Sequence, residues 1–412
     1  MNPLQAASRC VKCGLCLPVC PTFRLSGNEA DSPRGRVTLI QALLQDEALC
    51  SPGLLTHIDR CLQCGACQAM CPSNVAFTAL MDAARDSLEA RRRRTPAQRL
   101  ARRLGLGLVA GGGGSRRLLA VLLSLYRRSG LQRLARQSGL LRGTAARLDR
   151  ALARTPRRFV PATAAQPAAG SRGTVQLFTG CLSSLLDGDT LDASIRVLER
   201  LGYQVGAPAG QGCCGALHRH NGDGPGARRL ARANGRAFAG TRGPVLGTSS
   251  ACTAQLLDVD PALAADEAGA LAGRVTDILH FLCEGDQLPA LALKPLPQEV
   301  WVHLPCSQRN LLKDTDSVWR VLQAIPGIRL RALNPGGGCC GGAGSYFLGQ
   351  PQMADRLLEE TLAGAEAPGL VVTTNLGCAL QLAAGAKERG WPTEVLHPVV
   401  LLARQLPIPD HP

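Results

Sequence analysis

The sequence lacks several features that would assign it to common classes of protein. Aromatic residues make up only 3% of its 412 residues, so its cores must be built mainly from leucine, valine and alanine. The most apolar stretch, residues 118–125, is far shorter than the roughly 20 residues that a membrane-spanning helix needs. No G-x-G-x-x-G fingerprint follows an expected strand and no P-loop occurs, so we expect the chain to carry no FAD or NAD of its own.

Acidic residues are scarce in one long segment. Twenty arginines and very few acids lie from Arg85 to Arg158, and the whole chain has a net charge of +15. Such a block can be a solvated helical face, or it can attract an anionic membrane surface or a partner protein. Nucleic acid is a third interpretation. The chain has no aromatic stacking platform and no DNA-reading motif, so we expect no nucleic-acid partner.

Cysteine, by contrast, is abundant, with 18 residues. We expect no secretory signal ahead of Cys10, so this number indicates metal ligation in a reducing compartment rather than a disulfide framework. Eight of the cysteines form two runs of one pattern, C-x-x-C-x-x-C-x-x-x-C-P, which begin at Cys10 and Cys61. Bacterial ferredoxins ligate [4Fe–4S] clusters with this spacing, whereas structural zinc sites use C-x-x-C pairs.

The fourth cysteine of each run is expected to act apart from the other three. In two-cluster ferredoxins it ligates the cluster that the other run holds. The sequence therefore predicts two [4Fe–4S] clusters, with ligands Cys10, Cys13, Cys16 and Cys71 for the first and Cys20, Cys61, Cys64 and Cys67 for the second. Two adjacent clusters would form a short path for electrons.

The segments around the two runs read as helices. Val37, Ile40 and Leu43 follow Pro33 at helical spacing, and residues 75–81 after the second run also read as helix. We therefore expect an α plus α/β chain. Its predicted parts are a helical ferredoxin domain (1–84), a basic helical region with a linker (85–173), and two copies of an α/β cysteine-rich domain (174–290 and 291–412). Glycines 111–114 would interrupt the basic helices, and residues 156–173, rich in proline and alanine, would form the linker.

An internal repeat of cysteines predicts the two α/β copies. The repeated positions are Cys181, Cys213, Cys214 and Cys252 in the first copy and Cys306, Cys339, Cys340 and Cys378 in the second. The first pair is 125 residues apart and the other three are 126 apart. Short apolar runs at 175–178, 244–248, 300–303 and 370–374 read as strands of parallel α/β units. Because the carboxyl ends of parallel strands share one edge of a sheet, the cysteines of each copy should converge there.

Each adjacent pair of cysteines lies among glycines, which let a backbone fold closely about a bound group. Metal binding, by a further cluster or by zinc, is the first interpretation of both copies; a redox-active thiol pair and a vestigial site are the alternatives. His303, three residues before Cys306, is a further ligand candidate. We interpret His280 and His397 as packing residues, and Cys50 and Cys283 as small buried apolar residues.

Together these motifs resemble the iron–sulfur subunit of bacterial glycolate oxidase, which is related to the cysteine-rich subunits of heterodisulfide reductase and of anaerobic glycerol-3-phosphate dehydrogenase. The likeness rests on the two cysteine runs, on Ser32-Pro33-Arg34-Gly35-Arg36, on Cys71-Pro72-Ser73 and on the two Cys-Cys-Gly (CCG) blocks. One departure is that Gln255 and Gln381 stand where the heterodisulfide reductase relatives end the repeat in C-x-x-C. This difference argues against the non-cubane clusters and disulfide chemistry of those relatives and favours the glycolate oxidase branch.

The resemblance implies an electron-transfer subunit that has no catalytic residue of its own. Partner flavin subunits would oxidise glycolate to glyoxylate, and D-lactate as well, and electrons would pass through this chain to a membrane acceptor such as quinone. A cytoplasmic location, peripheral on the inner membrane, is also implied. Three alternatives stay open: a thiol or heterodisulfide reductase that reacts at the CCG cysteines, the iron–sulfur subunit of an anaerobic glycerol-3-phosphate dehydrogenase, and a basic nucleic-acid-binding protein with structural clusters.

Overall fold

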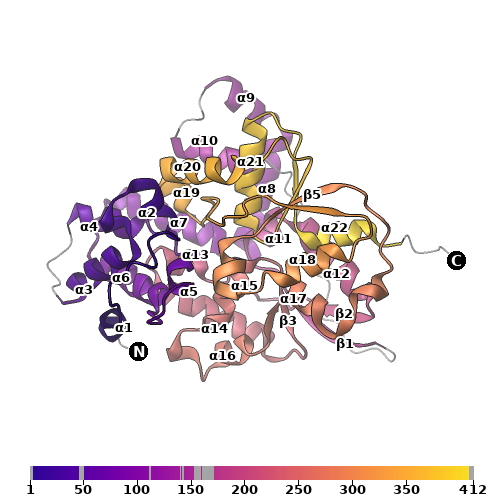
Figure 1. Cartoon of the computed structure of the whole chain (residues 1–412), viewed down its shortest axis with the longest axis horizontal. Coiled ribbons are helices and arrows are strands. Elements are labelled where there is room, and N and C mark those ends of the chain that lie inside the picture. Colours follow the sequence, from indigo (N-terminus) through magenta and orange to yellow (C-terminus); the bar gives the residue numbers. More distant parts are fainter. Residues whose placement is uncertain are drawn as a thin grey trace.

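The computed structural model describes residues 3–45, 51–110, 113–139, 141, 143–152, 159 and 171–407. A helical N-terminal part lies at one end of the molecule, and two sheet-containing units make up most of the rest (Figure 1). The basic helices reach both units, because Arg102 bonds the carbonyl of Asn221 in the first and Arg147 pairs with Asp355 in the second. Cys50 and most of the predicted linker lie outside the described residues.

The N-terminal part consists of helices joined by the two cysteine loops. They are α1 (Pro3–Ser8), α2 (Pro21–Ser26), the 3-10 turn η1 (Glu29–Asp31), α3 (Pro33–Gln45), α4 (Pro52–Asp59), α5 (Ala66–Ala69) and α6 (Phe77–Arg91). Val37, Ile40 and Leu43 on α3 are buried, as are Leu80 and Met81 on α6. Apolar residues at this spacing form one face of a helix, so α3 and α6 pack against each other. The predicted helices are confirmed, although the second begins at position 77 rather than 75.

The basic region is helical, as predicted. It forms α7 (Pro96–Ala110), α8 (Gly113–Arg128), α9 (Leu131–Gln137) and α10 (Gly143–Ala151). The interruption at the glycines is shorter than expected, because Gly113 and Gly114 belong to α8, while Gly111 and Gly112 lie outside the described residues. None of the helices in the described ranges is long and apolar enough to cross a membrane.

The remaining described residues form two α/β units of similar design. The first contains β1 (Gly173–Phe178), α11 (Leu182–Leu186), α12 (Gly188–Arg200), β2 (Tyr203–Gly206), α13 (Ala216–His220), α14 (Gly224–Ala239), β3 (Val245–Gly247), α15 (Ser250–Leu257), η2 (Pro261–Leu263), α16 (Glu267–Ala272), β4 (Val275–Asp277), α17 (Ile278–Cys283), η3 (Glu284–Asp286) and η4 (Leu288–Leu291). The second contains β5 (Glu299–His303), the π-helical segment η5 (Ser307–Leu312), α18 (Asp316–Gln323), β6 (Arg329–Ala332), α19 (Tyr346–Gly349), α20 (Pro351–Leu362), β7 (Leu370–Thr373), α21 (Leu376–Glu388), β8 (Glu394–Leu396) and α22 (Pro398–Gln405).

The two sheets share one topology, which confirms the predicted duplication. Their strand orders are β2-β1-β3-β4 and β6-β5-β7-β8, and every pair is parallel. Parallel strands are covered by helices on both faces and are therefore nearly continuous in apolar residues, as in β7, which is buried throughout. All four apolar runs singled out in the sequence form central strands of these sheets.

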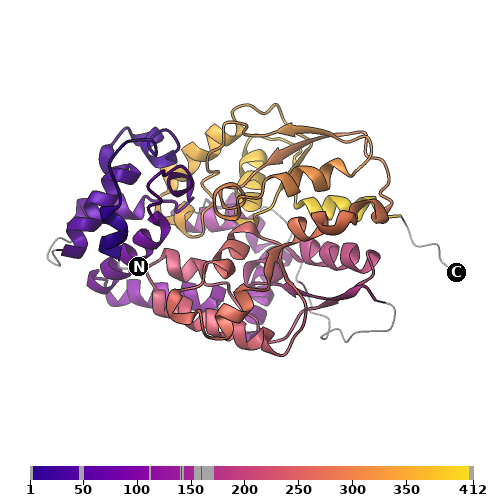
Figure 2. The same ribbon diagram turned by 60° about the horizontal axis from the view of Figure 1, so that its bottom comes forward.

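One continuous core joins the two units. The largest buried cluster contains Leu191 and Val197 of α12 and also Val399 and Leu402 of α22. These two helices pack directly against each other between the sheets, and the turned view shows the two units lying side by side (Figure 2). The carboxyl ends of β1 and β5 lead into Cys181 and Cys306, so both sets of repeated cysteines lie at strand ends, as expected.

Candidate metal centres

The two N-terminal cysteine loops repeat one backbone conformation. Lys12 and Gln63, each two residues after the first cysteine of a run, have φ angles of 55° and 51°. Gly14 and Gly65, each two residues further on, have φ angles of 88° and 72°. Left-handed backbone of this kind is costly for a residue that has a side chain. Its recurrence at matching positions therefore shows that the two runs fold into equivalent turns.

The structure brings together the four cysteines that were predicted to hold the second cluster. Cys20 from the first run lines one small cavity with the first three cysteines of the second run, together with Arg36 and Phe77. Burial raises the pKa of Cys64 and Cys67 well above the ordinary thiol value, and neighbouring cysteine charges add to the shift. Thiolates packed this closely are stable only when a cation offsets their charge.

The first set of cysteines lies nearer the surface. Cys13 is exposed, and Cys10 and Cys16 are half-buried. Burial raises the pKa of Cys16, and the charges of Cys10 and Cys13 raise it further, so these three thiols are neighbours. Cys71 packs against the same N-terminal core as Cys10. Between these cysteines, Val11 and Leu15 expose 70% and 55% of their surface, so the loop offers an apolar tip to solvent.

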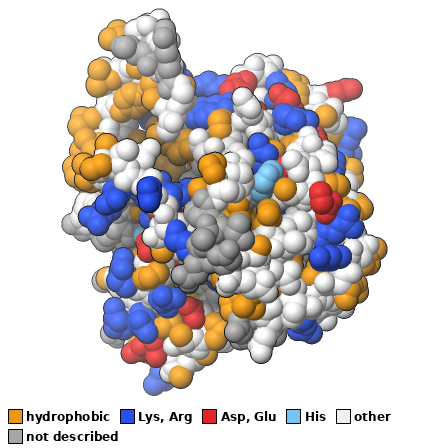
Figure 3. All heavy atoms as spheres, turned by 90° about the vertical axis from the view of Figure 1, so that its left-hand side faces the viewer, with side chains coloured by type: hydrophobic (Ala, Val, Ile, Leu, Met, Phe, Trp, Pro, Cys, Tyr) orange, Lys and Arg blue, Asp and Glu red, His pale blue; other side chains and the backbone are white. Residues whose placement is uncertain are grey.

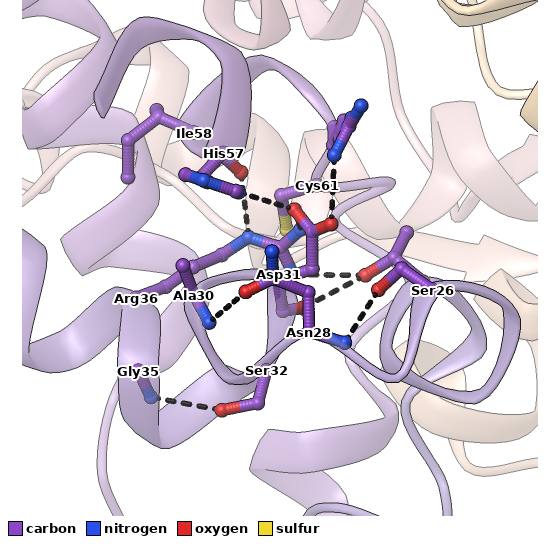
Figure 4. Close-up of polar contacts among 12 residues, drawn as sticks. Ser26, Asn28, Ala30, Asp31, Ser32, Gly35, Arg36, His57, Ile58 and Cys61 are labelled. Atoms are coloured by element: carbon purple, nitrogen blue, oxygen red, sulfur yellow. Dashed lines mark hydrogen bonds and ion pairs between the residues drawn. The ribbon is translucent and has the colours of Figure 1, made fainter. Parts of the chain in front are cut away.

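A buried charge network surrounds Asp31, and Figure 4 shows this residue beside Arg36 and His57. Asp31 is completely buried and pairs with Arg36 at 3.4 Å, with Nδ1 of His57 at 2.9 Å and with Arg60 at 3.0 Å. Arg36 also donates to Oγ1 of Thr22 at 2.9 Å, and Thr22 donates to the carbonyl of Asp31 at 3.0 Å. Sγ of Cys20 lies 3.4 Å from the same hydroxyl. The network therefore holds the crossing cysteine and places a guanidinium in the wall of the cavity.

The Ser-Pro-Arg-Gly-Arg segment that precedes and opens α3 thus braces both loops. Arg34 donates to the carbonyl of Lys12 at 3.2 Å in the first loop and pairs with Glu29 at 2.7 Å. A Cβ on Gly35 would lie 2.0 Å from the carbonyl oxygen of Glu29, so only glycine fits between the two arginines. The sequence showed this segment as a family motif, but its bracing role became visible only in the structure.

A second arginine, half-buried, joins the N-terminal part to the first α/β unit. Arg85 donates to the carbonyl of Cys61 at 2.6 Å, to Gln63 at 2.6 Å and to the carbonyl of His220 at 2.9 Å. Asp86 accepts from the backbone N–H of Gly224 at 3.0 Å nearby. These bonds fix the second cysteine loop against α13 and α14.

The second α/β unit places its CCG cysteines directly against that loop. Cys64, Cys306 and Cys339 pack into one apolar cluster with Leu62 and Tyr346. Asn310 donates to the carbonyl of Cys64 at 2.9 Å. The Tyr346 hydroxyl is buried without a hydrogen-bond partner among the described residues, and burial followed by the charges of Cys339 and Cys61 raises its pKa. An orphaned donor between two groups of cysteines fits a site in which sulfur accepts its hydrogen bond.

Three side chains of the second unit lie at metal-ligand distance from one another. Ligand atoms of His303, Cys340 and Cys378 all lie within 4.8 Å of each other, and the two sulfurs are 3.0 Å apart. A tetrahedral ion with bonds of about 2.0 Å to nitrogen and about 2.3 Å to sulfur separates its ligand atoms by about 3.5–3.8 Å. Burial lowers the pKa of His303 to about 3, which keeps the imidazole neutral, and Thr373 bonds Nδ1 at 2.9 Å, which leaves Nε2 for a metal.

The glycines after the pair are needed for packing. A Cβ on Gly341, whose φ is 78°, would lie 2.4 Å from the carbonyl oxygen of Ala354, and one on Gly342 would lie 2.6 Å from that of Gly377. Gln381, at the position of the missing cysteine, is buried beside Gly342, and its Nε2 has no hydrogen-bond partner in the described part of the chain. Gln255 in the first unit is half-buried.

The first unit pairs its cysteines in the same way as the second but without the matching histidine. Cys214 and Cys252 have sulfurs 3.3 Å apart, and Cys181 packs with Cys213 against Leu230. Hydrogen bonding from Cys181, and then from Cys214, lowers the pKa of Cys213, and the nearby His218 adds to this shift. Phe178 stands where the second unit has its histidine. The metal-ligand cluster found among the described residues therefore belongs to the second unit.

The two units meet beside their cysteine sites. Oγ of Ser250, at the start of α15, lies 2.7 Å from Oγ of Ser307 at the start of η5. The backbone N–H of Ser250 donates to the carbonyl of Thr374 at 2.9 Å. Each serine is close in sequence to a CCG cysteine, Cys252 or Cys306, so this contact joins the two segments that carry them.

The remaining candidates have structural roles. Cys283 is buried in the main core and His280 is exposed beside Asp314 at 2.9 Å, as their interpretation required. Nδ1 of His397 accepts from the N–H of Val399 at 3.1 Å and caps α22. Sequence reasoning missed Tyr346, Arg85 and His218, because isolated residues of these types carry no spacing signal.

Comparison with known proteins agrees with this arrangement. The model of a family described as a 4Fe-4S dicluster domain matches residues 6–75, and that of a cysteine-rich domain family, CCG, matches residues 175–257 and 300–383. Lactate utilization protein A of Shouchella clausii is 27% identical over 233 residues, which are 54% of this chain and 95% of that protein.

Two relatives align with almost the whole chain. The probable glycolate oxidase iron-sulfur subunit of Bacillus subtilis is 31% identical over 402 residues, covering 92% of this chain and 89% of the relative. The glycolate oxidase iron-sulfur subunit of Escherichia coli is 32% identical over 398 residues, covering 93% and 91%. Since both the domains and nearly the full length correspond, the chain belongs to the family of glycolate oxidase iron–sulfur subunits.

Proposed function

We propose that this chain is the electron-transfer subunit of a flavin-dependent glycolate dehydrogenase. Glycolate, and also D-lactate, is then oxidised on partner flavin subunits, and this chain carries the electrons away. Relatives named for glycolate oxidase and lactate utilization support these substrates. The observation that carries the proposal is the packing of Cys64 with Cys306 and Cys339, which puts ferredoxin-type cysteines next to CCG cysteines.

We assign two [4Fe–4S] clusters to the N-terminal loops. The proposed ligands are Cys10, Cys13, Cys16 and Cys71 for the first cluster and Cys20, Cys61, Cys64 and Cys67 for the second. The shared cavity of the second set and the orphaned hydroxyl of Tyr346 beside it support this assignment. When bound, such clusters supply one-electron carriers. The protein's own contribution is burial, the positive charge of Arg36 and the position of each thiol.

The exposed first loop is the proposed input side. Val11 and Leu15 are among the most exposed large apolar residues of the described chain, and Cys13 lies between them. A partner flavin subunit that covers this tip would bury the apolar residues and bring its flavin close to the first set of cysteines.

For the CCG copies we propose a metal site in the second unit. Its ligands are His303, Cys340 and Cys378, whose ligand atoms lie within 4.8 Å of one another, and Cys306 and Cys339 are the candidates for further thiolate ligands. Zinc, which takes four such ligands, or a further cluster fits these donors. The matching cysteines of the first unit, Cys181, Cys213, Cys214 and Cys252, are a candidate for a second such site without the histidine.

The proposed output is a membrane acceptor such as quinone, with the chain peripheral on the cytoplasmic face of the inner membrane. Helices α7, α8 and α9 contain no acidic residue. Several of their leucines have at least half of their own surface exposed. Hydrophobic and basic side chains gather at the upper left of the face in Figure 3. Exposed leucine beside arginine is the composition that binds an anionic lipid surface.

Iron and sulfide analysis with EPR tests the assignment. We expect anaerobically purified chain to hold two [4Fe–4S] clusters, Cys71→Ser to lose the signal of the first, and Cys20→Ser to lose that of the second. Cys283→Ser, a buried cysteine outside all sets, is the matched control and should retain both. Zinc in place of iron, or loss of the same signal in both variants, would contradict the ligand sets.

The division of labour needs a separate test. The chain alone should not oxidise glycolate, whereas its complex with the flavin subunits should do so with a soluble dye as acceptor. Glycolate, D-lactate and glycerol 3-phosphate should be compared, since only the first two fit the proposal. Turnover of glycolate by the isolated chain would contradict it.

A thiol or heterodisulfide reductase is the second candidate, favoured by the 3.3 Å approach of the Cys214 and Cys252 sulfurs. It requires that Cys214→Ser abolish reduction of a disulfide substrate while the N-terminal clusters persist. Absence of disulfide reduction by the wild-type complex would exclude this function.

A further inference from the structure

A pocket of about 540 Å³ lies between helix α7 and helix α14, beside the cysteines of the first α/β unit. It is lined by Leu106 and Gly107 from α7, His218 from α13, and Arg229, Leu230, Arg232, Ala233 and Arg236 from α14. Neither the cluster assignment nor the CCG sites account for this pocket.

The pocket combines an apolar wall with three exposed arginines. Leu106, Leu230 and Ala233 provide the apolar part. Arg232 pairs with Asp266 at 3.1 Å, whereas Arg229 and Arg236 form no ion pair with any described residue. A ligand that fits must therefore have a flat or bulky apolar body and oxygen atoms that accept hydrogen bonds from guanidinium groups. A small hydrophilic anion would leave the apolar wall uncovered.

The pocket also reaches the thiols of the first unit. Leu230 lines the pocket and packs against Cys181 and Cys213. His218 lines the pocket as well, is only 7% exposed and stands close enough to Cys213 to affect its thiol. Nδ1 of His218 is buried with no hydrogen-bond partner among the described residues. One side chain, Leu230, therefore separates a ligand in the pocket from the cysteines. The ring of His218, whose Nε2 lies 3.7 Å from Asp223, lies beside Cys213.

Helix α7 connects the pocket with the exposed leucine face. Gly107 follows Leu104 by three residues and Leu100 by seven, so all three lie on one side of the helix. Leu100 and Leu104 are exposed by 58% and 54%. A lipophilic molecule held in a lipid surface under this face would enter the pocket past Gly107, where an added Cβ would meet no atom within 4 Å.

We propose that this pocket binds a membrane quinone and is the place where electrons leave the protein. The inference rests on the proposed electron-transfer function. Oxidation of glycolate to glyoxylate releases two electrons and two protons. A quinone takes up two electrons, delivered one at a time, and two protons from water, and its two C=O groups become C–OH groups. Arginines at the carbonyl oxygens stabilise the negative charge that develops before protonation.

The test fills the pocket without disturbing the fold. Gly107→Leu projects a side chain into the pocket, and Gly105→Leu, on the opposite side of α7, is the matched control, since neither added Cβ meets another atom. Replacing glycine in a helix interior also favours the helix, so both variants should fold. The probe is the quinone analogue 2-heptyl-4-hydroxyquinoline N-oxide, titrated by fluorescence quenching into the full cluster-containing chain. We expect Gly107→Leu to raise its Kd at least tenfold and Gly105→Leu to leave it unchanged.

The complex with the flavin subunits separates two kinds of failure. In Gly107→Leu, glycolate oxidation with a soluble dye should persist while KM for a short-chain quinone rises. Equal probe affinity in both variants would show that the pocket does not bind the quinone analogue, without contradicting the electron-transfer function. If Gly107→Leu alone loses the probe but the complex never reduces the dye with glycolate, the pocket assignment stands and the proposed function is wrong. Displacement of the probe by millimolar phosphate or glyoxylate would identify an anion site and overturn the quinone assignment.

Discussion

Buried charged side chains determine where the cysteine loops lie. Asp31 has no exposed surface and is the common partner of Arg36, Arg60 and His57, so removing this carboxylate would leave the buried guanidinium of Arg36 without an opposite charge. Arg85 has the same role at the junction with the first α/β unit. Each of these residues positions backbone or thiol groups of a loop.

Asp277, at the end of β4, gives a prediction about pH. Burial raises the pKa of its carboxyl to about 7; the charge of Asp314 adds to this, and bonds from the N–H groups of Leu279 and His280 oppose it. Between pH 4 and 7 the folded chain therefore binds a proton that the unfolded chain has released, so stability falls as pH rises through this window. Asp277→Asn keeps the acceptor for Leu279 and removes the ionisation.

We expect Asp277→Asn to flatten this decline and to gain as much as roughly 4 kcal/mol over wild type at pH 8, with little gain near pH 4. Denaturant unfolding of both proteins from pH 5 to 8 measures it. The control is Asp286→Asn, an exposed position. A constant difference between the Asp277 variant and wild type across this range would contradict the assignment.

At the scale of elements, periodic patterns were predictable and single contacts were not. The helix after Pro33 and the four apolar strands follow from residues that repeat along the chain, because burial of one face or of a whole strand leaves a regular pattern. The contact of Asn310 with Cys64 joins residues 246 positions apart and leaves no local trace. For the same reason, the sequence carried no signal for the packing of Cys64 against Cys306 and Cys339.

Helix α8 leads to a prediction about membranes. Leu118, Leu122 and Leu125 repeat at intervals of four and three residues and are all more than half exposed. Burial of one leucine in an apolar phase stabilises binding by about 1.5–3 kcal/mol. Leu122→Glu combined with Leu125→Glu should therefore lower partition onto vesicles of phosphatidylcholine and phosphatidylglycerol at least tenfold in a sedimentation assay.

The control for this measurement changes charge equally without touching the leucines. Ser129→Glu combined with Gln137→Glu places two carboxylates at exposed polar positions of the same helical group. It should lose only the electrostatic part of binding, which rising salt also removes. Equal loss in the two double variants would show that charge alone, and not the leucine face, holds the chain to lipid.

At the scale of the whole molecule, the N-terminal part contacts both α/β units, through Arg85 and through Asn310. Stabilisation by bound clusters should therefore reach the entire chain. A cluster present at about 1,000 times its Kd adds roughly 4 kcal/mol, which corresponds to about 5 °C in Tm for a chain of this size.

We accordingly expect removal of iron by a chelator under reducing conditions to lower Tm by roughly 5 °C for each cluster lost. Scanning calorimetry of loaded and iron-free chain measures the change, and reconstitution with iron and sulfide should restore it. An iron-free chain with unchanged Tm would show that the loops carry no stabilising metal.

The repeated strand order of the two sheets has a consequence for how the chain diverged. If two identical subunits paired through the Ser250–Ser307 contact, one gene would encode both, and every substitution would change both halves of the dimer. Joined in one chain, the halves are encoded separately, and each is free to specialise. Histidine at 303, where the first unit has phenylalanine at 178, is a mark of that freedom. One duplicated fold can therefore hold two different sites within a single chain.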